Sequence, residues 1–332
     1  MEKLLIKGGK CLSGEIDCSG AKNAALPVIA ASILSSDDIT LQNLPFLQDI
    51  TTMFELIGSM GADISLDENM NFKINTSNLS SLEARYELVK TMRASILVLG
   101  SMIAKYGYAK IALPGGCAIG SRPVNYHLNA LKKLGAEISL KNGYIEARSK
   151  GLIGANIKFE GITVTGTENL MMAASLAEGE TILSNVAKEP EISDLADFLN
   201  SMGANILGAG TDEIRIKGVK RLNGTTFKIP ADRIEAGTYL IAAALTNGKI
   251  TINKIDSKRM DAILLNLKKA GAHIISNDQS ITLDMRDNKI MPVDIITEPF
   301  PGFPTDMQAQ FTVLNCMSNG SASVRETIFE NR

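Results

Sequence analysis

The feature that most constrains the fold is a segment, present four times, in which a helix-like stretch ends at Gly-Ala and leads into a strand-like stretch. The copies read SMGADISL, KLGAEISL, SMGANILG and KAGAHIIS, with glycines at Gly61, Gly135, Gly203 and Gly271. These glycines are 74, 68 and 68 residues apart. Glycine ends helices because it adopts the left-handed conformation without a Cβ penalty. The spacing predicts several copies of one α/β repeat.

A second glycine marks the same repeat after an alanine-rich, helix-like stretch and before another strand. Its copies are Gly107, Gly179, Gly248 and Gly320. The predicted repeat is therefore a helix, a strand, a helix and two strands, over about seventy residues. Residues 213–217 alternate between polar and apolar, which favours a sheet with one covered face.

A longer period is superimposed, because residues 6–14 match residues 216–224 at an offset of 210. Three repeats make up this offset, so we expect a duplicated lobe of three repeats, with boundaries near residues 20 and 230. By the same spacing the fifth repeat is half present and the sixth is absent. We therefore expect a truncated or proteolysed chain, or a broken gene.

Composition excludes several classes of protein. The 332 residues carry a net charge of −2, with 5% aromatic residues and no tryptophan, which disfavours nucleic-acid binding. No apolar run reaches the roughly 18 residues that span a membrane, and the first residues lack a signal-peptide core. The four cysteines form no CxxC pair, so we expect no metal site and a cytoplasmic protein with reduced thiols.

One loop departs from the repeat and carries a thiol. In the second repeat the connection swells into residues 114–123, PGGCAIGSRP, which places Cys117 near Arg122. A guanidinium favours the thiolate, so this is either a reactive loop or a glycine-rich turn with a bystander thiol. We expect the other three cysteines, Cys11, Cys18 and Cys316, to be core residues.

Three charged positions are further candidates. Lys22 and Asn23 open a predicted helix, where backbone N–H groups attract phosphate, although a solvated surface lysine is the alternative. Arg93 leads into an apolar helix and either binds an anion or extends to the surface. Asp306 follows a proline-rich segment and either caps a helix or acts as a general base.

Neither histidine has a visible partner, so His127 and His273 are assigned structural roles. The candidates Lys22, Arg93, Arg122, Cys117 and Asp306 would together form a site for a small polyanion with an acid and a base. The residues alone thus predict an enzyme that acts on a phosphorylated small molecule.

Five motifs carry a family resemblance: SGAKNAALP, LVKTMRAS, LPGGCAIGSRPVNYH, FPTDMQAQ and ETIFENR. Together they closely resemble the UDP-N-acetylglucosamine 1-carboxyvinyltransferase family of enolpyruvyl transferases, from the first strand to Arg332. The resemblance implies a two-lobed, inside-out α/β barrel built from βαβαββ repeats, of which the last are missing here. The lobes would be residues 22–229, which carry three repeats and the Cys117 loop, and residues 1–21 plus 230–332, which form an incomplete lobe.

The implied reaction transfers the enolpyruvyl group of phosphoenolpyruvate to the 3′-hydroxyl of UDP-N-acetylglucosamine and releases phosphate. It passes through a tetrahedral addition intermediate and is the first committed step of peptidoglycan synthesis in cell-wall biogenesis. The partners would be these two small-molecule substrates, with no cofactor, nucleic acid or membrane.

The resemblance also assigns residues. Cys117 matches the proton donor, which is also alkylated by the antibiotic fosfomycin, and Asp306 matches the base. The positions that match phosphoenolpyruvate contacts are Lys22, Asn23, Arg122 and Arg332. Those that match UDP-N-acetylglucosamine contacts are Arg93, Arg122, Pro123, Val124, Asn125, Tyr126, Asp306 and Ile328.

Some positions depart from the family pattern. Many members have Asp where this chain has Asn125 and Lys where it has Gly161, which leaves the nucleotide contacts of residues 163–166 open. The family's last repeat supplies further site residues, so we expect this chain to be inactive or impaired. Two alternatives are a shikimate-pathway enolpyruvyl transferase, which lacks the cysteine loop, and a non-catalytic nucleotide-sugar binder.

Overall fold

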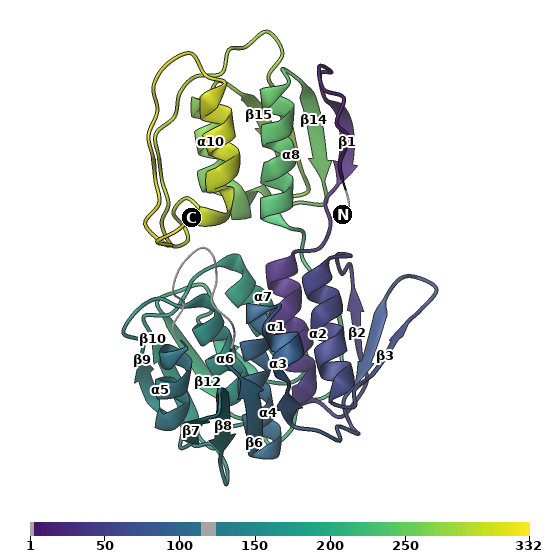
Figure 1. The fold of residues 1–332 in the computed structure, drawn as a ribbon, viewed down its shortest axis with the longest axis vertical. Helices are drawn as coiled ribbons and strands as arrows, with labels where there is room; N and C mark the ends of the chain where they lie inside the picture. Colours follow the sequence, from purple (N-terminus) through teal and green to yellow (C-terminus); the bar gives the residue numbers. More distant parts are fainter. Residues whose placement is uncertain (1–2, 114–123) are drawn as a thin grey trace. The chain divides into compact units, whose positions relative to one another are not determined.

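The computed structural model describes residues 3–113 and 124–332, which divide into two compact units (Figure 1). Unit 1 consists of residues 3–19 and Ala231–Phe329. Unit 2 consists of Gly20–Pro230, without the undescribed residues, and Glu330–Arg332. Each unit has a hydrophobic core of its own.

Unit 2 contains three copies of one arrangement. The first consists of β13 (Thr226–Lys228), α1 (Lys22–Ala31), η1 (Ser32–Leu34), β2 (Ile39–Gln42), α2 (Gln48–Ser59), β3 (Asp63–Leu66) and β4 (Phe72–Asn75). The second consists of β5 (Glu83–Ala84), α3 (Tyr86–Val89), η2 (Arg93–Leu97), α4 (Val98–Tyr106), β6 (Tyr108–Ala112), α5 (Asn125–Lys133), β7 (Glu137–Lys141) and β8 (Tyr144–Arg148). The third consists of β9 (Asn156–Lys158), α6 (Val164–Ala174), β10 (Glu180–Ser184), α7 (Pro190–Ser201), β11 (Asn205–Leu207) and β12 (Glu213–Lys217).

Each copy forms a four-stranded sheet with the same topology. Within the described ranges the strand orders are β13-β2-β4-β3, β5-β6-β8-β7 and β9-β10-β12-β11. In each sheet the first two strands are parallel and the others antiparallel. In the second and third copies, helical segments connect the two parallel strands, because parallel neighbours need a long crossover connection. In the first copy the partner of β2 is β13, the last strand of unit 2 in the sequence.

Helices α1, α4 and α6, each of which precedes the second strand of its sheet, form the interior of unit 2. Residues 24–31 of α1, 98–103 of α4 and 166–174 of α6 are buried without interruption. A helix that is buried all round must lie inside a core, and these helices contact one another. Alanine and glycine allow the close approach: a Cβ added to Gly100 of α4 would lie 2.3 Å from the backbone oxygen of Asn169 in α6.

Unit 1 repeats the same topology once. It contains β1 (Ser13–Asp17), α8 (Arg233–Leu245), β14 (Lys249–Asn253), η3 (Ser257–Met260), α9 (Asp261–Lys269), β15 (His273–Ser276) and β16 (Ser280–Asp284). The sheet order is β1-β14-β16-β15, with β1 parallel to β14. The rest of the unit is β17 (Ile295–Ile296), η4 (Thr305–Met307), α10 (Gln308–Cys316) and β18 (Val324–Arg325), in which β17 and β18 pair in parallel. Helices α8 and α10 pack side by side (Figure 1).

The predicted turns and the predicted α/β class are confirmed. The four Gly-Ala glycines, Gly61, Gly135, Gly203 and Gly271, have φ between 93° and 108°, the left-handed region that favours glycine. Each follows a helix and precedes a strand, as the repeat predicted. None of the helices in the described part of the chain is long and apolar enough to cross a membrane.

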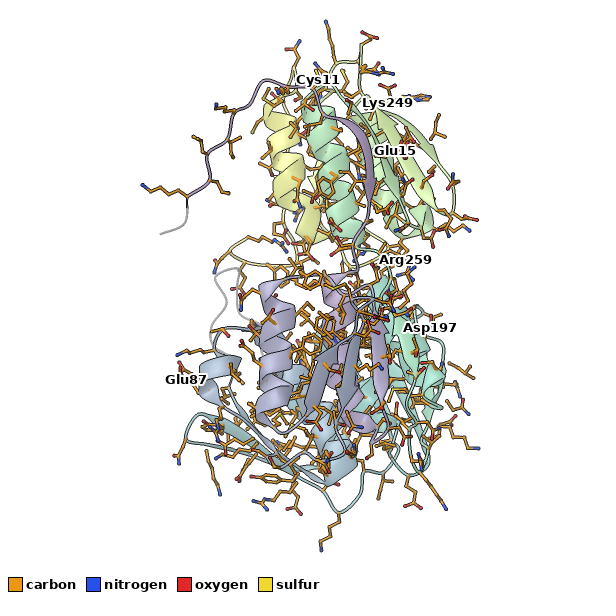
Figure 2. All side chains as sticks on the ribbon, turned by 90° about the vertical axis from the view of Figure 1, so that its right-hand side faces the viewer. Cys11, Glu15, Glu87, Asp197, Lys249 and Arg259 are labelled. Carbon is orange, nitrogen blue, oxygen red and sulfur yellow. The ribbon has the colours of Figure 1, made fainter. Side chains whose placement is uncertain are left out.

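The cysteine prediction was partly wrong. Cys18 is buried, but Cys11 and Cys316 are exposed; Figure 2 labels Cys11 on the segment that leads into β1. Residues 3–12 precede the first strand and are exposed, so the apolar side chains near Cys11 do not enter a core. Cys316 is the last residue of α10, where the buried face of that helix ends.

The thiols should therefore differ in reactivity. The Cys18 thiol donates hydrogen bonds to the Asp232 backbone oxygen (3.2 Å) and to Oε2 of Glu235 (3.5 Å). Burial and the Glu235 carboxylate raise the pKa of the Cys18 thiol to about 12. We expect iodoacetamide at about pH 8 to alkylate Cys11 and Cys316 and to spare Cys18 until the protein is denatured, as measured by peptide mass spectrometry. Modification of native Cys18 as fast as Cys316 would contradict this.

Candidate functional site

Lys22 and Asn23 lie in the first turn of α1. Ala21 precedes the helix and makes no side-chain cap hydrogen bond. Lys22 is half-buried, and its Nζ forms an ion pair of 3.0 Å with Oδ2 of Asp49 in the first turn of α2; Asn23 is exposed. The Asp49 carboxylate therefore holds the Lys22 amine in place. An anion bound there would share the positive charge of Lys22 with Asp49.

Arg93 and the predicted nucleotide-sugar segment lie close together in unit 2. Arg93 is half-buried at the start of η2, and its charge acts on His127 in the first turn of α5. The same turn carries Asn125, which is exposed, and Tyr126, which is half-buried; Val124 precedes it. The charge of Arg93 therefore reaches the first turn of α5, which also carries Asn125 and Tyr126.

His127 is the central residue of this region. It is 3% exposed; its Nδ1 lies 2.9 Å from Nδ2 of Asn169, and its Nε2 lies 3.3 Å from Oγ1 of Thr165. Burial, with a smaller effect of Arg93, lowers the pKa of the imidazole to about 4, so the ring is neutral near pH 7. The structural role predicted for His127 is confirmed, but the sequence offered no sign of its partners, because they lie 38 and 42 residues along the chain.

The start of α6 completes this part of unit 2. Thr163 precedes the helix and caps it, its Oγ1 accepting a hydrogen bond of 3.2 Å from the Gly166 N–H. Two residues earlier, a Cβ added to Gly161 would lie 2.9 Å from Oη and 3.3 Å from Cζ of Tyr126. The tyrosine therefore occupies the space that a side chain at position 161 would need. A side chain at this departure from the family pattern would require the Tyr126 side chain to shift.

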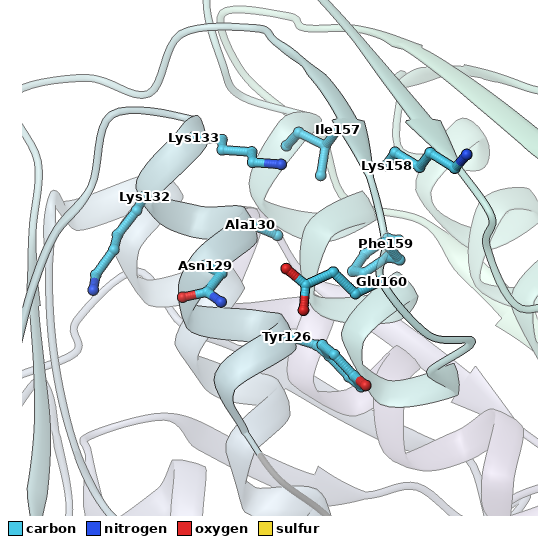
Figure 3. Close-up of a pocket in the computed structure, with 9 residues that line it drawn as sticks. All are labelled: Tyr126, Asn129, Ala130, Lys132, Lys133, Ile157, Lys158, Phe159 and Glu160. Atoms are coloured by element: carbon cyan, nitrogen blue, oxygen red, sulfur yellow. The ribbon is translucent and has the colours of Figure 1, made fainter.

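A pocket of about 280 Å³ lies between α5 and the segment around β9 (Figure 3). It is lined by Tyr126, Asn129, Ala130, Lys132, Lys133, Ile157, Lys158, Phe159 and Glu160. In Figure 3 the Lys133 amine and the Glu160 carboxylate point into its centre, whereas Lys132 points away. Tyr126 thus lines the pocket from the first turn of α5.

In unit 1, Glu326 joins the segment that contains Asp306 to the segment that contains Ile328. Asp306 is half-buried within η4, whose cap position is Pro304, so the capping role considered for this aspartate is wrong. The hydroxyl of the neighbouring Thr305 donates 2.8 Å to Oε2 of Glu326, and the backbone N–H of Ile328 donates 2.7 Å to Oε1.

Glu326 was not identified from the sequence, although it begins the ETIFENR motif. It also accepts hydrogen bonds from the Thr297 hydroxyl (2.9 Å) and the Phe329 N–H (3.0 Å). Desolvation acts to raise the pKa of this carboxyl, but the four hydrogen bonds outweigh it and lower the pKa. Glu326 therefore remains a carboxylate that holds the segments of Asp306 and Ile328 to each other.

The remaining predicted residues are only partly described. Cys117, Arg122 and Pro123 lie outside the described residues. Arg332 is half-buried and groups with unit 2, whereas Asp306 and Ile328 belong to unit 1. The described site residues thus form two sets, one around His127 in unit 2 and one around Glu326 in unit 1, with Lys22 and Asn23 at the start of α1.

Comparisons with known proteins point to one family. A family model described as EPSP synthase (3-phosphoshikimate 1-carboxyvinyltransferase) matches residues 6–332. A UDP-N-acetylglucosamine 1-carboxyvinyltransferase of Hydrogenovibrio crunogenus is 54% identical over 332 residues, which are 100% of this chain and 79% of that protein.

Solved structures show the same fold. The enolpyruvyl transferase NikO from Streptomyces tendae superposes with a TM-score of 0.87 at 20% identity, over 98% of this chain and 77% of that one. An EPSP synthase from Acinetobacter baumannii gives a TM-score of 0.71 at 16% identity, over 96% of this chain and 74% of that one. The α/β architecture is therefore shared with proteins of only 16–20% overall identity.

Proposed function

We propose a function from the premise that this chain belongs to the EPSP synthase (3-phosphoshikimate 1-carboxyvinyltransferase) family. The chain transfers the enolpyruvyl group of phosphoenolpyruvate to the 3′-hydroxyl of UDP-N-acetylglucosamine and releases phosphate, in peptidoglycan synthesis. The observation that carries this choice of acceptor is the 54% identity, over the whole chain, to a UDP-N-acetylglucosamine 1-carboxyvinyltransferase.

The reaction needs one base, one acid and a set of cations. The 3′-oxygen attacks C2 of phosphoenolpyruvate while C3 takes up a proton, which forms a tetrahedral intermediate; loss of phosphate and of a C3 proton restores the double bond. We assign the base to Asp306 and the proton donor to Cys117. Hydrogen bonds from Thr305 and Ile328 to Glu326 support this role for Asp306, because they hold its segment in place.

Binding of the two anionic substrates falls to different segments. We assign phosphoenolpyruvate to Lys22, Asn23, Arg122 and Arg332. We assign UDP-N-acetylglucosamine to Arg93, Arg122, Pro123, Val124, Asn125, Tyr126, Asp306 and Ile328. The effect of the Arg93 charge on His127, in the first turn of α5, supports the second assignment, since one diphosphate could contact Arg93 and the start of α5. Cations placed before the reaction stabilise charge that moves toward the leaving phosphate.

The domain organisation and location are part of the same proposal. The chain forms two lobes in this proposal, residues 22–229 and residues 1–21 plus 230–332. The division into units 1 and 2 and the pairing of β1 with β14 support these lobes, except that Glu330–Arg332 group with unit 2. The enzyme acts in the cytoplasm on small molecules, without a nucleic-acid or membrane partner, in line with the net charge of −2 and the absence of basic runs.

A phosphate-release assay tests the acceptor. Any phosphate that the chain releases from phosphoenolpyruvate, at the impaired rate expected from the sequence or at a normal one, should require UDP-N-acetylglucosamine and should not appear with 3-phosphoshikimate. Release with 3-phosphoshikimate alone would favour the shikimate-pathway alternative. Binding of UDP-N-acetylglucosamine without any phosphate release would identify a non-catalytic binder.

A further inference from the structure

The hydrogen bonds around Asn169 determine which way its amide faces. Its Oδ1 lies 2.6 Å from the backbone nitrogen of Gly100, which can only donate, so the oxygen end of the amide faces Gly100. Its Nδ2 therefore faces the Ile96 carbonyl, at 2.8 Å, and His127 Nδ1, at 2.9 Å. Both amide protons are used, and the side chain is buried with 0% exposure.

The amide in turn determines the tautomer of His127. Because Nδ2 of Asn169 donates, Nδ1 of His127 accepts, and the single proton of the neutral ring sits on Nε2. That proton points to Oγ1 of Thr165, 3.3 Å away. A second proton on the ring would sit on Nδ1 and face the Asn169 N–H, so two donors would oppose each other. This cost to the protonated ring agrees with the lowered pKa of His127.

Thr165 accepts the last hydrogen bond in this series, from Asn169 through His127. Its oxygen accepts from His127, so its own O–H proton must point away from the ring. Thr165 is half-buried in the first turn of α6, whereas His127 is 3% exposed. The hydroxyl can therefore reach a ligand that the imidazole cannot.

The same network connects the segments assigned to the nucleotide sugar. Ile96 and Gly100 lie in η2 and α4 and follow Arg93, His127 follows Val124–Tyr126, and Asn169 and Thr165 belong to α6. One buried amide and one imidazole thus hold three separate stretches of chain together.

We propose that His127 and Asn169 are positioning residues for the UDP-N-acetylglucosamine site, and that they direct the Thr165 hydroxyl to donate to the anionic diphosphate of that substrate. The inference rests on the proposed function for its ligand. The tautomer and the connections follow from contacts within unit 2 alone.

Asn169→Asp reverses the direction of the hydrogen bond to His127 Nδ1 and nearly keeps the shape of the side chain. A carboxylate accepts from the Gly100 N–H as the amide does, but it also accepts from Nδ1 and so moves the ring proton there. Nε2 then becomes an acceptor that draws the Thr165 proton away from the ligand. We expect UDP-N-acetylglucosamine to bind about tenfold more weakly by isothermal titration calorimetry on the full chain. The KM for phosphoenolpyruvate should change less than about twofold.

Thr165→Val removes the hydroxyl without touching the buried amide, and we expect a similar loss of affinity. Thr251→Val is the matched control, because it also removes a threonine hydrogen bond, to Thr282 at 2.9 Å, but in the sheet of unit 1. The double variant of Asn169→Asp and Thr165→Val should lose no more than Thr165→Val alone, since both act through one hydroxyl.

Nuclear magnetic resonance reads the tautomer directly. The chain has two histidines, so long-range ¹H–¹⁵N spectra are simple, and His127→Asn assigns the signals. We expect the wild-type ring to carry its proton on Nε2 and the Asn169→Asp ring to carry one on Nδ1.

The possible results separate a failure of this inference from a failure of the proposed function. Unchanged affinity in Thr165→Val and Asn169→Asp, with normal wild-type binding, would overturn the inference and leave the proposed function standing. A wild-type ring protonated on Nδ1 would overturn it as well. Wild-type protein that fails to bind UDP-N-acetylglucosamine would instead overturn the proposed function and, with it, the ligand named here.

Discussion

Replacing Asp306 by asparagine is expected to lower kcat for phosphate release about 10²- to 10⁴-fold. Asparagine has nearly the same shape but cannot take a proton from the 3′-hydroxyl, so the loss should fall on the chemical step. The Thr305 and Ile328 hydrogen bonds to Glu326 do not involve the changed side chain and should persist. The KM for UDP-N-acetylglucosamine should therefore change little compared with kcat.

The control for Asp306→Asn is Asp261→Asn. Asp261 also lies in unit 1, in the first turn of α9, but it is exposed and is not assigned to the substrate. This change should leave kcat within about twofold of the wild type. If Asp306→Asn kept wild-type kcat while both variants folded normally, Asp306 would not be the base.

The repeat could be predicted from the sequence because neighbouring residues specify it, whereas the strand pairing could not be predicted. A helix that ends at Gly61 or Gly271 and turns into a strand is specified by neighbouring residues, and the observed φ values agree. The pairs β13–β2 and β1–β14 join segments roughly 190 and 240 residues apart. No turn or spacing in the sequence encodes such a pairing; the family resemblance suggested only that residues 1–21 join the second lobe.

The sequence offers candidate site residues where a charge stands at the start of a helix, and not where a side chain acts through buried contacts. Lys22 and Arg93 are such candidates, because cations at the starts of helices are visible in the sequence. The partners of His127 were missed, since Asn169 and Thr165 look like ordinary residues of a helix. Glu326 was missed because its carboxylate accepts hydrogen bonds from backbone N–H groups. Nearly every residue has such a group, so the sequence does not mark these partners.

A second large effect is expected at Glu168, a carboxyl buried in α6 with 2% exposure. Burial raises its pKa well above the usual range, and the charges of Glu191 and Glu189 near the start of α7 raise it further. Between the unfolded and folded pKa values the folded protein holds a proton that the unfolded chain has released. The wild type should therefore lose stability as the pH rises through this window.

Glu168→Gln tests this because glutamine resembles the protonated acid and does not titrate. We expect the variant to gain stability relative to the wild type by about 1.4 kcal/mol per pH unit, starting above about pH 5 and ending where folded Glu168 ionises. Urea unfolding at several pH values measures the difference, in which the titration of His127 cancels because both proteins contain it. Glu137→Gln, at an exposed position of β7, should show no such slope. A difference that is flat with pH, or one that falls as pH rises, would mean that Glu168 is ionised in the folded protein.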